Sequence, residues 1–437
     1  MRRAKAKHAL SPTWPTLRPH KQQSAFWRTR AKFIHIAAGR GSGKTECTRR
    51  RQIRWLPVKY KGIDQPLHAF ALPTYRQAKR VAWEPLLKLI PRSWIHKVSY
   101  SELTVETVFG SKLYVLGLDK PERAEGVQWS TFVIDESCDQ KPGVFDRSIL
   151  PALSHNCDWC ARIGVPKRFG PGALEFRLAW EKAHTSADPN SVSFGWPSSD
   201  IVDPEIIAWA QENLAPEDYD EQYNANWLSL GGGVYYGFDP NDSVCESAEF
   251  KPDIPIGVGS DFNVDPMAWV LGQKVGRELH IFNEIVKRNT NTRKTLDHLF
   301  ALHGTHSSGW MFTGDASGRA RKTSASKSDY LQIYNDSRFI NKRVQYAKKN
   351  SLIADRVATV NAGLDSFAGI RKIKIHPRCT TLIGELDTLG YKKGTREIDD
   401  VGGSVGHVTD AFGYLCQKYI PMEAYHGVLP EISISTG

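Results

Sequence analysis

The feature that most constrains the fold is a glycine-rich turn between a strand-like and a helix-like segment. Residues 32–38 (KFIHIAA) form an apolar run of strand length, and a helix-compatible ECTRRRQIRWL begins at residue 46. The turn between them consists of Gly39, Arg40, Gly41, Ser42, Gly43, Lys44 and Thr45. This order is typical of a P-loop, whose backbone N–H groups enclose a phosphate at a helix N-terminus. Lys44 is expected to reach the β- and γ-phosphates and Thr45 to hold Mg²⁺, although the strict pattern has glycine in place of Ala38.

An acidic pair after a second apolar run is the expected partner of this turn. Residues 130–139 read STFVIDESCD, so a short strand-like run (131–134) ends in Asp135 and Glu136. An acid at the tip of a strand beside the P-loop strand would orient Mg²⁺ through its water shell. Glu136 would then polarise the attacking water as a general base. An Asp-Glu pair alone is common, but downstream of a P-loop it indicates a nucleotide hydrolase.

Positive charge is concentrated in two parts of the chain. The net charge is +11, and residues 1–54 hold 15 Lys and Arg against one acid. Residues 316–350 hold nine basic residues and two acids, whereas 200–226 have eight acids and no Lys or Arg. Basic tracks suit a polyanion such as DNA, because affinity for DNA comes largely from phosphate neutralisation. The alternative for any one run is a solvated face, and the acidic stretch is most simply the exposed side of helices around 204–214 and 216–227.

Composition and cysteine usage favour an intracellular globular protein. With 41% hydrophobic and 24% charged residues the chain is not mainly disordered, and it has no apolar run of membrane-spanning length. The basic start lacks the apolar core of a secretory signal, and seven scattered cysteines suit a reducing compartment. Cys157 and Cys160, with His155 nearby, raise the alternative of a zinc site. No second such pair follows, so two reduced thiols are the favoured interpretation.

A second domain is expected after the glycines at 231–233. Three strand-like runs follow (256–262, 267–272 and 279–286), and Asp261 ends the first, an order that resembles an RNase H-like fold. A further apolar run, 310–314, leads to Asp315, and Asp410 lies in a segment with helical apolar spacing. Phosphodiester hydrolysis uses carboxylates around two Mg²⁺ or Mn²⁺ ions, one activating water and the other stabilising the leaving oxygen.

The front-half motifs resemble those of the large terminase subunit of tailed bacteriophages, the motor that pumps DNA into procapsids. Gln22, in Pro19-His20-Lys21-Gln22, matches the family's adenine-side glutamine, and Arg40 matches an arginine inside its P-loop. Residues 121–126 (PERAEG) match a stretch before the acidic strand. The resemblance implies that Arg123 is an arginine finger acting on a neighbouring subunit's ATP. The alternative is a surface salt bridge with Glu122 or Glu125.

One motif departs from the family. Its coupling motif usually reads Gly-Thr-Pro, whereas this chain has Gly164-Val165-Pro166. Either the hydroxyl is dispensable here, or Thr185-Ser186 takes its role.

The back half has its carboxylates in the same order as the family's nuclease domain. The resemblance also covers residues 355–357, 372–379 and Tyr391. We therefore expect Asp261, Asp315 and Asp410 to be the metal ligands. Four further residues are weaker candidates for metal ligands, and a structural role is favoured for each of them: Asp265, Asp399, Asp400 and His407. The basic residues after Asp315 (Arg319, Arg321, Lys322 and Lys327) are expected to form a phosphate track leading to the metals.

These patterns together predict an α/β protein of three parts. A P-loop ATPase with a mostly parallel sheet (1–195) is followed by a helical subdomain and linker (196–232) and an RNase H-like endonuclease (233–437). The expected function is ATP-driven translocation of double-stranded DNA into procapsids, with metal-dependent cutting of concatemers, in the host cytoplasm. The resemblance implies a homo-pentamer on the portal protein, with the small terminase subunit as a further partner.

Two alternatives stay open. An ATP-dependent helicase or repair nuclease outside packaging would need the motifs of a second RecA-like domain, where the nuclease stands instead. A catalytically inert DNA-binding scaffold is the other, and the intact lysine and acids argue against it.

Overall fold

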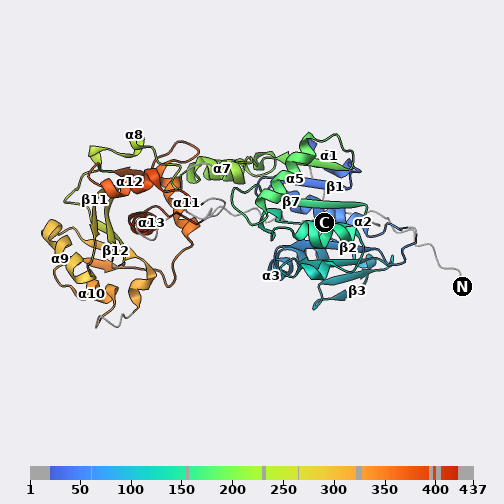
Figure 1. Cartoon of the computed structure of the whole chain (residues 1–437), viewed down its shortest axis with the longest axis horizontal. Coiled ribbons are helices and arrows are strands. Elements are labelled where there is room, and N and C mark those ends of the chain that lie inside the picture. The colour runs from blue at the N-terminus through green and yellow to red at the C-terminus, as the bar shows by residue number, and fades with distance from the viewer. Residues whose placement is uncertain are drawn as a thin grey trace, which may run out of the picture. The chain divides into compact units, whose positions relative to one another are not determined.

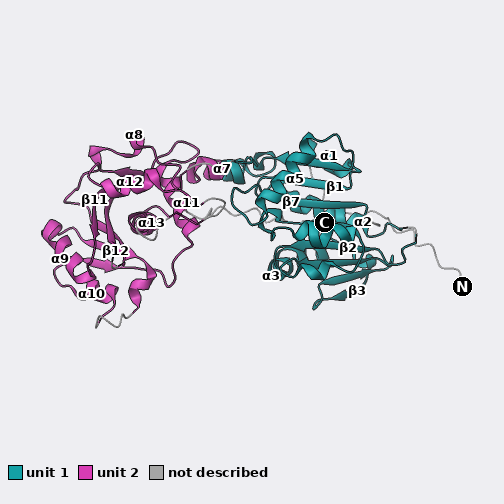
Figure 2. Cartoon of the chain, viewed as in Figure 1, with its two compact units in different colours: residues 1–207, 220–229, 428–437 teal, residues 208–219, 230–427 magenta. Residues whose placement is uncertain are grey.

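Two compact units make up the computed structural model, which describes residues 20–60, 62–153, 157–228, 233–263, 265–320, 327–392, 397–399 and 405–421. The first unit contains the described parts of 1–207 and 220–229, and the second those of 208–219 and 230–427 (Figures 1 and 2). The division passes through the acidic segment. The carbonyl of Leu214 there accepts a hydrogen bond from the backbone N–H of Phe367, which belongs to the second unit. The expected three-part division, with boundaries at 195 and 232, stays a prediction.

The first unit is built on an eight-stranded sheet. Its strands are β1 (Phe33–Ala38), β2 (Leu67–Leu72), β3 (Ile95–Ser99), β4 (Thr104–Thr107), β5 (Lys112–Gly117), β6 (Trp129–Ile134), β7 (Trp159–Gly164) and β8 (Ser191–Trp196). Its helices are α1 (Lys21–Arg28), α2 (Lys44–Trp55), α3 (Tyr75–Gln77), α4 (Glu84–Leu89) and α5 (Ala173–Thr185), and α6 (Pro204–Asn213) and α7 (Pro216–Gln222) cross the division. The strand order is β3-β4-β5-β2-β6-β7-β1-β8, and the six strands from β5 to β8 run parallel. This confirms the predicted α/β class with a mostly parallel sheet.

Burial of the central strands explains their apolar sequences. All six residues of β6 and all six of β7 are buried, as expected for parallel strands covered on both faces. One expectation was wrong in detail: the strand of the acidic pair does not lie beside the P-loop strand. β7 lies between them and pairs with both, since Ala161 is opposite Ile34 on one side and Val133 on the other. The ends of all three strands still open at one edge of the sheet, because they are parallel.

The second unit has a six-stranded mixed sheet. Its strands are β9 (Ile256–Asp261), β10 (Met267–Val275), β11 (Glu278–Lys287), β12 (Trp310–Gly314), β13 (Lys342–Val344) and β14 (Ile373–Ile375). Its helices are α8 (Pro240–Ser243), α9 (Thr292–His303), α10 (Asp329–Asn335), α11 (Ile353–Leu364), α12 (Thr380–Thr388) and α13 (His407–Tyr419). The order is β13-β12-β9-β10-β11-β14, with β10 antiparallel to both of its neighbours. The three strand-like runs and the late helix of the sequence prediction are therefore present.

Helix α13 packs closely on the centre of this sheet. A Cβ atom at Gly259 would lie 2.2 Å from the carbonyl oxygen of Ala411, so only glycine permits this approach. The apolar side of α13 joins a core that includes Val270, Ile281 and Phe412. This packing brings the first turn of the helix to the end of β9.

Candidate functional site

The P-loop adopts a conformation that its glycines make possible. Gly41 and Gly43 have φ values of 70° and 76°, in the left-handed region that favours glycine. A Cβ atom at Gly39 would lie 2.4 Å from the hydroxyl oxygen of Ser198, so this position also requires glycine. Ala38 is still the last residue of β1, paired with Trp196. Its departure from the strict pattern therefore falls on an ordinary strand position.

Side chains from α1 and the end of β8 hold the loop in place. The carbonyl of Ser42 accepts hydrogen bonds from Nε1 of Trp196 at 2.9 Å and from Nε2 of Gln23 at 3.2 Å. Gln23 is buried, whereas Gln22, the residue selected from the sequence, is exposed on α1. Gln23 lies one helical turn before the buried Phe26, so the helix directs Gln23 inward instead of Gln22.

Lys44 and Thr45 begin α2, at the position where a nucleotide phosphate would lie. Lys44 is only 6% exposed, and its Nζ donates to the carbonyl of Gly39 at 3.3 Å. Burial lowers the pKa of Lys44, while the charges of Asp135 and Glu136 oppose that shift. The charge of Lys44 therefore interacts with the charges of Asp135 and Glu136, in a site where Lys44 is buried.

The acidic pair follows β6 and meets the P-loop across the end of β7. Burial raises the pKa of Asp135 to about 6, and the neighbouring Glu136 carboxylate adds to this, whereas the nearby Lys44 and Thr45 side chains act to lower it. Glu136 has a φ of 52°, in the left-handed region that is unfavourable for a residue other than glycine. The Thr45 hydroxyl and the Asp135 carboxylate, which lie near each other, are oxygen donors of the kind that suit Mg²⁺.

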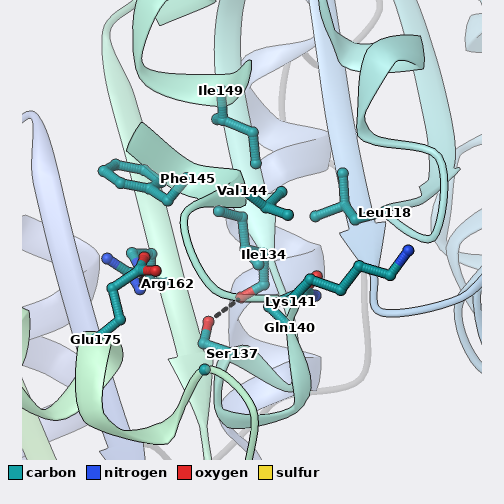
Figure 3. A pocket seen from close by; sticks show the side chains of 11 residues that line it. Leu118, Ile134, Ser137, Gln140, Lys141, Val144, Phe145, Ile149, Arg162 and Glu175 are labelled. Atoms are coloured by element: carbon teal, nitrogen blue, oxygen red, sulfur yellow. Dashed lines mark hydrogen bonds and ion pairs between the residues drawn. The ribbon is translucent and has the colours of Figure 1, made fainter. Parts of the chain in front are cut away.

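An ion pair that the sequence analysis missed joins β7 to α5, and Figure 3 shows its two side chains. Nη2 of Arg162 in β7 is 2.9 Å from Oε1 of Glu175 in α5, and Oε2 of Glu175 accepts the backbone N–H of Gly143 at 2.8 Å. Arg162 and Glu175 line a small cavity of about 10 Å³, room for about one water molecule. Nε2 of Gln140, also in its lining, donates to the carbonyl of Asp135 at 3.3 Å. The only signal in the sequence was an arginine inside an otherwise apolar strand.

The predicted coupling segment contacts the loop after Glu136. A Cβ atom at Gly164 would lie 3.2 Å from the backbone nitrogen of Ser137. Beyond it, Nζ of Lys167 lies 2.5 Å from Oδ2 of Asp139. Thr185, the alternative coupling residue, is exposed at the end of α5, and its hydroxyl donates to Glu181 in its own helix.

Arg123 lies on the surface in a short helical turn, Pro121–Ala124. Its guanidinium group is 5.9 Å from the centre of the Tyr75 ring. Among the described residues no ion pair is recorded between Arg123 and Glu122 or Glu125. The side chain of Arg123 is therefore exposed to solvent, in the turn that follows β5.

In the second unit, the structure brings the three predicted carboxylates to one edge of the sheet. β9 and β12 are parallel neighbours with Ser260 opposite Gly314, so Asp261 and Asp315 leave the sheet side by side. The backbone N–H of Asp315 donates to the carbonyl of Ser260 at 3.0 Å. Asp410 joins them from the first turn of α13.

Each of these carboxylates already has a polar partner. Oδ2 of Asp261 is 2.8 Å from Nδ1 of His407, and Oδ1 of Asp410 is 2.7 Å from Nη2 of Arg356. Oδ1 of Asp315 accepts from Nδ2 of Asn350 at 2.6 Å. In the described part of the chain, no group of three or more His, Cys, Asp or Glu side chains lies close enough to hold a metal ion. The predicted ligands thus share an edge without forming a closed ligand cluster.

The three acids nevertheless influence one another. Burial is the main reason why the pKa of Asp261 is raised, and the charges of Asp410 and Asp315 raise it further, against the effect of His407. Mutual repulsion of this kind is relieved by a cation, and carboxylate oxygens are the ligands that Mg²⁺ and Mn²⁺ prefer. The donor chemistry therefore fits the predicted metals.

The other predicted residues contribute less or lie outside the description. Asp265 is exposed and lies 3.3 Å from Arg288, and the backbone N–H of Asp399 donates to Gly390. Cys157 and Cys160 are free thiols. Four of the predicted residues lie outside the described residues: Asp400, Arg321, Lys322 and His155. None of the described helices is long and apolar enough to cross a membrane.

Comparison with known proteins identifies the fold. No protein-family model and no curated protein sequence matches the chain. A solved large terminase from a thermophilic bacteriophage matches with a TM-score of 0.54 and 13% identity, over 91% of this chain and 98% of that one. Structures of the same terminase in complex with ADP and with ATP-gamma-S match over the same shares at 14% identity, with TM-scores of 0.53 and 0.51. The resemblance inferred from sequence motifs is confirmed at the level of the fold.

Proposed function

We propose that this chain, which has the fold of a bacteriophage large terminase, hydrolyses ATP in its first unit to move double-stranded DNA and cuts DNA with its second unit. The observation that supports this most is the proximity of Lys44 and Thr45 to Asp135, whose pKa both side chains act to lower. It joins the P-loop to the acidic pair, although the two motifs come from strands that are not neighbours. The terminase of the thermophilic bacteriophage, whose fold this chain shares, has been solved with ADP and with ATP-gamma-S.

Each residue of the nucleotide site has a distinct role in this proposal. The ammonium group of Lys44 binds the β- and γ-phosphate oxygens, and the P-loop backbone holds them in position. Thr45 and Asp135 would hold Mg²⁺, which when bound would supply positive charge to the phosphates. Glu136 accepts a proton from the attacking water. Arg123, exposed at the surface, stabilises the transition state of a neighbouring subunit.

The network behind the acids offers a route by which nucleotide state reaches the rest of the unit. A displacement of Glu136 would change the loop that carries Asp139 and Gly143, and these residues are tied to Lys167 and Glu175. Glu175 lies in α5. That helix also contacts the end of the unit, since Nη1 of Arg177 donates to the carbonyl of Leu228 at 2.8 Å. Charged and backbone contacts can therefore replace the threonine hydroxyl that the coupling segment lacks at Val165.

The second unit would hydrolyse phosphodiesters with Asp261, Asp315 and Asp410. A bound Mg²⁺ or Mn²⁺ would supply an activated water and stabilise the leaving oxygen. His407 contacts Asp261 and Arg356 contacts Asp410, so a metal ion would compete with these two side chains for the carboxylate oxygens. His407 and Arg356 also remain near the reacting phosphate as positively charged or hydrogen-bonding groups.

The test is to measure ATP turnover with and without double-stranded DNA, beside plasmid cleavage with Mg²⁺ or Mn²⁺. The proposal expects DNA-stimulated turnover and metal-dependent cleavage, without ATP-driven separation of the strands along the duplex. Strand unwinding would favour the helicase alternative. The absence of both ATP turnover and DNA cleavage would favour the inert scaffold. Sedimentation in the presence of ATP, with and without a portal protein, tests the ring and docking that the resemblance implies.

A further inference from the structure

The described residues of the second unit form an open groove beside the carboxylates, with a volume of about 710 Å³. Its walls are the end of β12, the segment 344–351 and one side of α13. Strand β12 and helix α13 are both labelled in Figure 1. The segment 344–351 carries no function in the proposal above.

This groove adjoins the proposed cutting site, since its lining includes Gly314, the residue before Asp315. Asn350, in its wall, donates to the carboxylate of Asp315 at 2.6 Å. Tyr414, in the opposite wall, has its pKa raised by burial and further by the charges of Asp315, Asp410 and Asp261, against the effect of Arg356. A chain lying in the groove would therefore reach the carboxylates at its end.

Charge and hydrogen-bonding groups in the groove suit a phosphate backbone. None of the described lining residues is acidic, and Lys349 and Lys418 are both exposed at its rim. Nζ of Lys418 donates to Oε1 of Gln345, another lining residue. Amides and lysines of this kind bind phosphate and sugar without reading sequence.

An aromatic pair provides a stacking surface for a base. The ring of Tyr346 lies 4.0 Å from the ring of the buried Tyr330, at an interplanar angle of 21°. Tyr346 is 43% exposed, so a base can stack on it from the solvent side. Bases inside a duplex are already stacked on one another, whereas those of a single strand can stack on protein aromatics.

We propose that this groove binds a single strand of DNA, stacking a base on Tyr346 and placing the adjoining phosphate at the carboxylates. The exposed ring of Tyr346 supports one strand over a duplex, because only unpaired bases are free to stack on a protein aromatic side chain. This inference rests on the proposed nuclease function and specifies the form of its substrate. The cut would then be made one strand at a time, on DNA that is locally opened.

The experiment compares binding of a labelled mixed-sequence single strand with binding of the same sequence as a duplex. Anisotropy of the full-length protein is measured in EDTA, which prevents cutting. Tyr346→Ala should weaken single-strand binding about 5- to 100-fold and change duplex binding less than about twofold. Tyr346→Phe, which keeps the ring, should bind the single strand like wild type. The matched control is Tyr334→Ala, because Tyr334 is a 67% exposed tyrosine outside the groove lining.

Salt dependence tests the lysines independently of stacking. Lys349→Ala should reduce the salt slope of single-strand binding by about 0.7, the value for one phosphate contact. Lys294→Ala, on the exposed side of α9, should leave the slope unchanged. Equal losses on single strand and duplex for Tyr346→Ala, or no loss on either, would overturn the proposal of a single-strand groove.

Failure of the groove and failure of the proposed function give different results. If the groove is wrong, wild-type protein still binds duplex, cuts plasmid and hydrolyses ATP while the Tyr346 variants behave like wild type. If the proposed function is wrong, wild-type protein itself lacks these activities.

Discussion

Thr45, at the start of α2, lies close enough to Asp135, at the end of β6, to oppose the rise that burial causes in the pKa of that carboxyl group. β7 separates β6 from the P-loop strand, so the two residues approach each other above the end of a strand that contributes neither of them. In the proposed function, this proximity would provide one site for a phosphate and its cation. It also explains why residues after β7 lie against the same loop.

Replacing Lys44 by alanine should lower ATP turnover by about 100-fold or more, because its buried ammonium group is the P-loop cation expected to bind the phosphates. The fold should persist, since within the described residues the Lys44 side chain donates only to the loop carbonyl of Gly39. Turnover and circular dichroism are measured on the same sample. Lys88→Ala, on the exposed face of α4, is the control. Normal turnover in Lys44→Ala would remove the P-loop from the mechanism.

Arg123→Ala should lower ATP turnover by about 1,000-fold while nucleotide affinity changes little, because a finger acts on charge that develops in the transition state. If the finger acts between subunits, mixing this variant with Glu136→Ala should restore part of the turnover. Some interfaces in the mixture then combine an intact base with an intact finger. Absence of recovery at concentrations where rings form would assign Arg123 to its own subunit or to a structural role.

The Arg162–Glu175 pair should matter for stability. Glu175→Leu leaves the guanidinium of Arg162 buried without its counter-ion, and we expect a loss of about 3 kcal/mol in the free energy of unfolding. Arg162→Met/Glu175→Leu should lose less than the sum of the two single variants, because the unpaired charge is removed. Glu181→Ala, from the exposed pair with Arg177 on the same helix, should cost less than about 1 kcal/mol. Urea unfolding is measured for wild type and for the four variants, which include Arg162→Met alone. If the double variant loses the sum of the two single losses in free energy of unfolding, Arg162 and Glu175 are not coupled.

Acidification should destabilise the first unit through His68. Its Nδ1 lies 2.8 Å from Oγ1 of Thr131, and complete burial lowers the pKa of His68 to about 3. Between pH 6.5 and 3 the unfolded chain binds a proton that the folded chain does not, so stability falls as the pH falls. The contribution is about 1.4 kcal/mol per pH unit below about 6.5.

The measurement is urea unfolding of wild type and His68→Asn at about pH 7 and about pH 5.5. Asparagine keeps a polar partner for Thr131 but does not titrate. The variant should therefore lose about 1.4 kcal/mol less than wild type on acidification. Equal losses would show that His68 is protonated alike in the folded and unfolded states.

Local signals predicted the parts of this protein that depend on neighbouring residues in the chain. The P-loop was readable because Gly41 and Gly43 need a backbone conformation that few other residues adopt. The ends of β6, β9 and β12 were readable because an acid follows an apolar run at each of them. The α/β class followed from the alternation of such runs with helical segments.

Long-range pairing explains what could not be predicted. Placing β7 between β1 and β6 requires knowledge of sheet order, which strand-like runs alone do not contain. The partners of the carboxylates lie far from them along the chain: His407 is 146 residues from Asp261, Arg356 is 54 from Asp410, and Asn350 is 35 from Asp315. The motif pointed to Gln22, whereas the buried glutamine is Gln23, because burial depends on which face of α1 packs against the unit.

We claim that one chain carries two separable activities, and Asp315→Asn should remove one of them while the other persists. This variant keeps the size of the side chain but removes one negative charge from the carboxylate edge, so divalent-ion binding and DNA cutting should fall together. Plasmid cleavage with Mg²⁺ or Mn²⁺ is measured beside ATP turnover on one preparation, with Asp253→Asn, an exposed acid, as the control. We predict that cleavage falls at least about 100-fold while ATP turnover stays within about twofold of wild type. Unchanged cleavage, or joint loss of both activities, would contradict the claim.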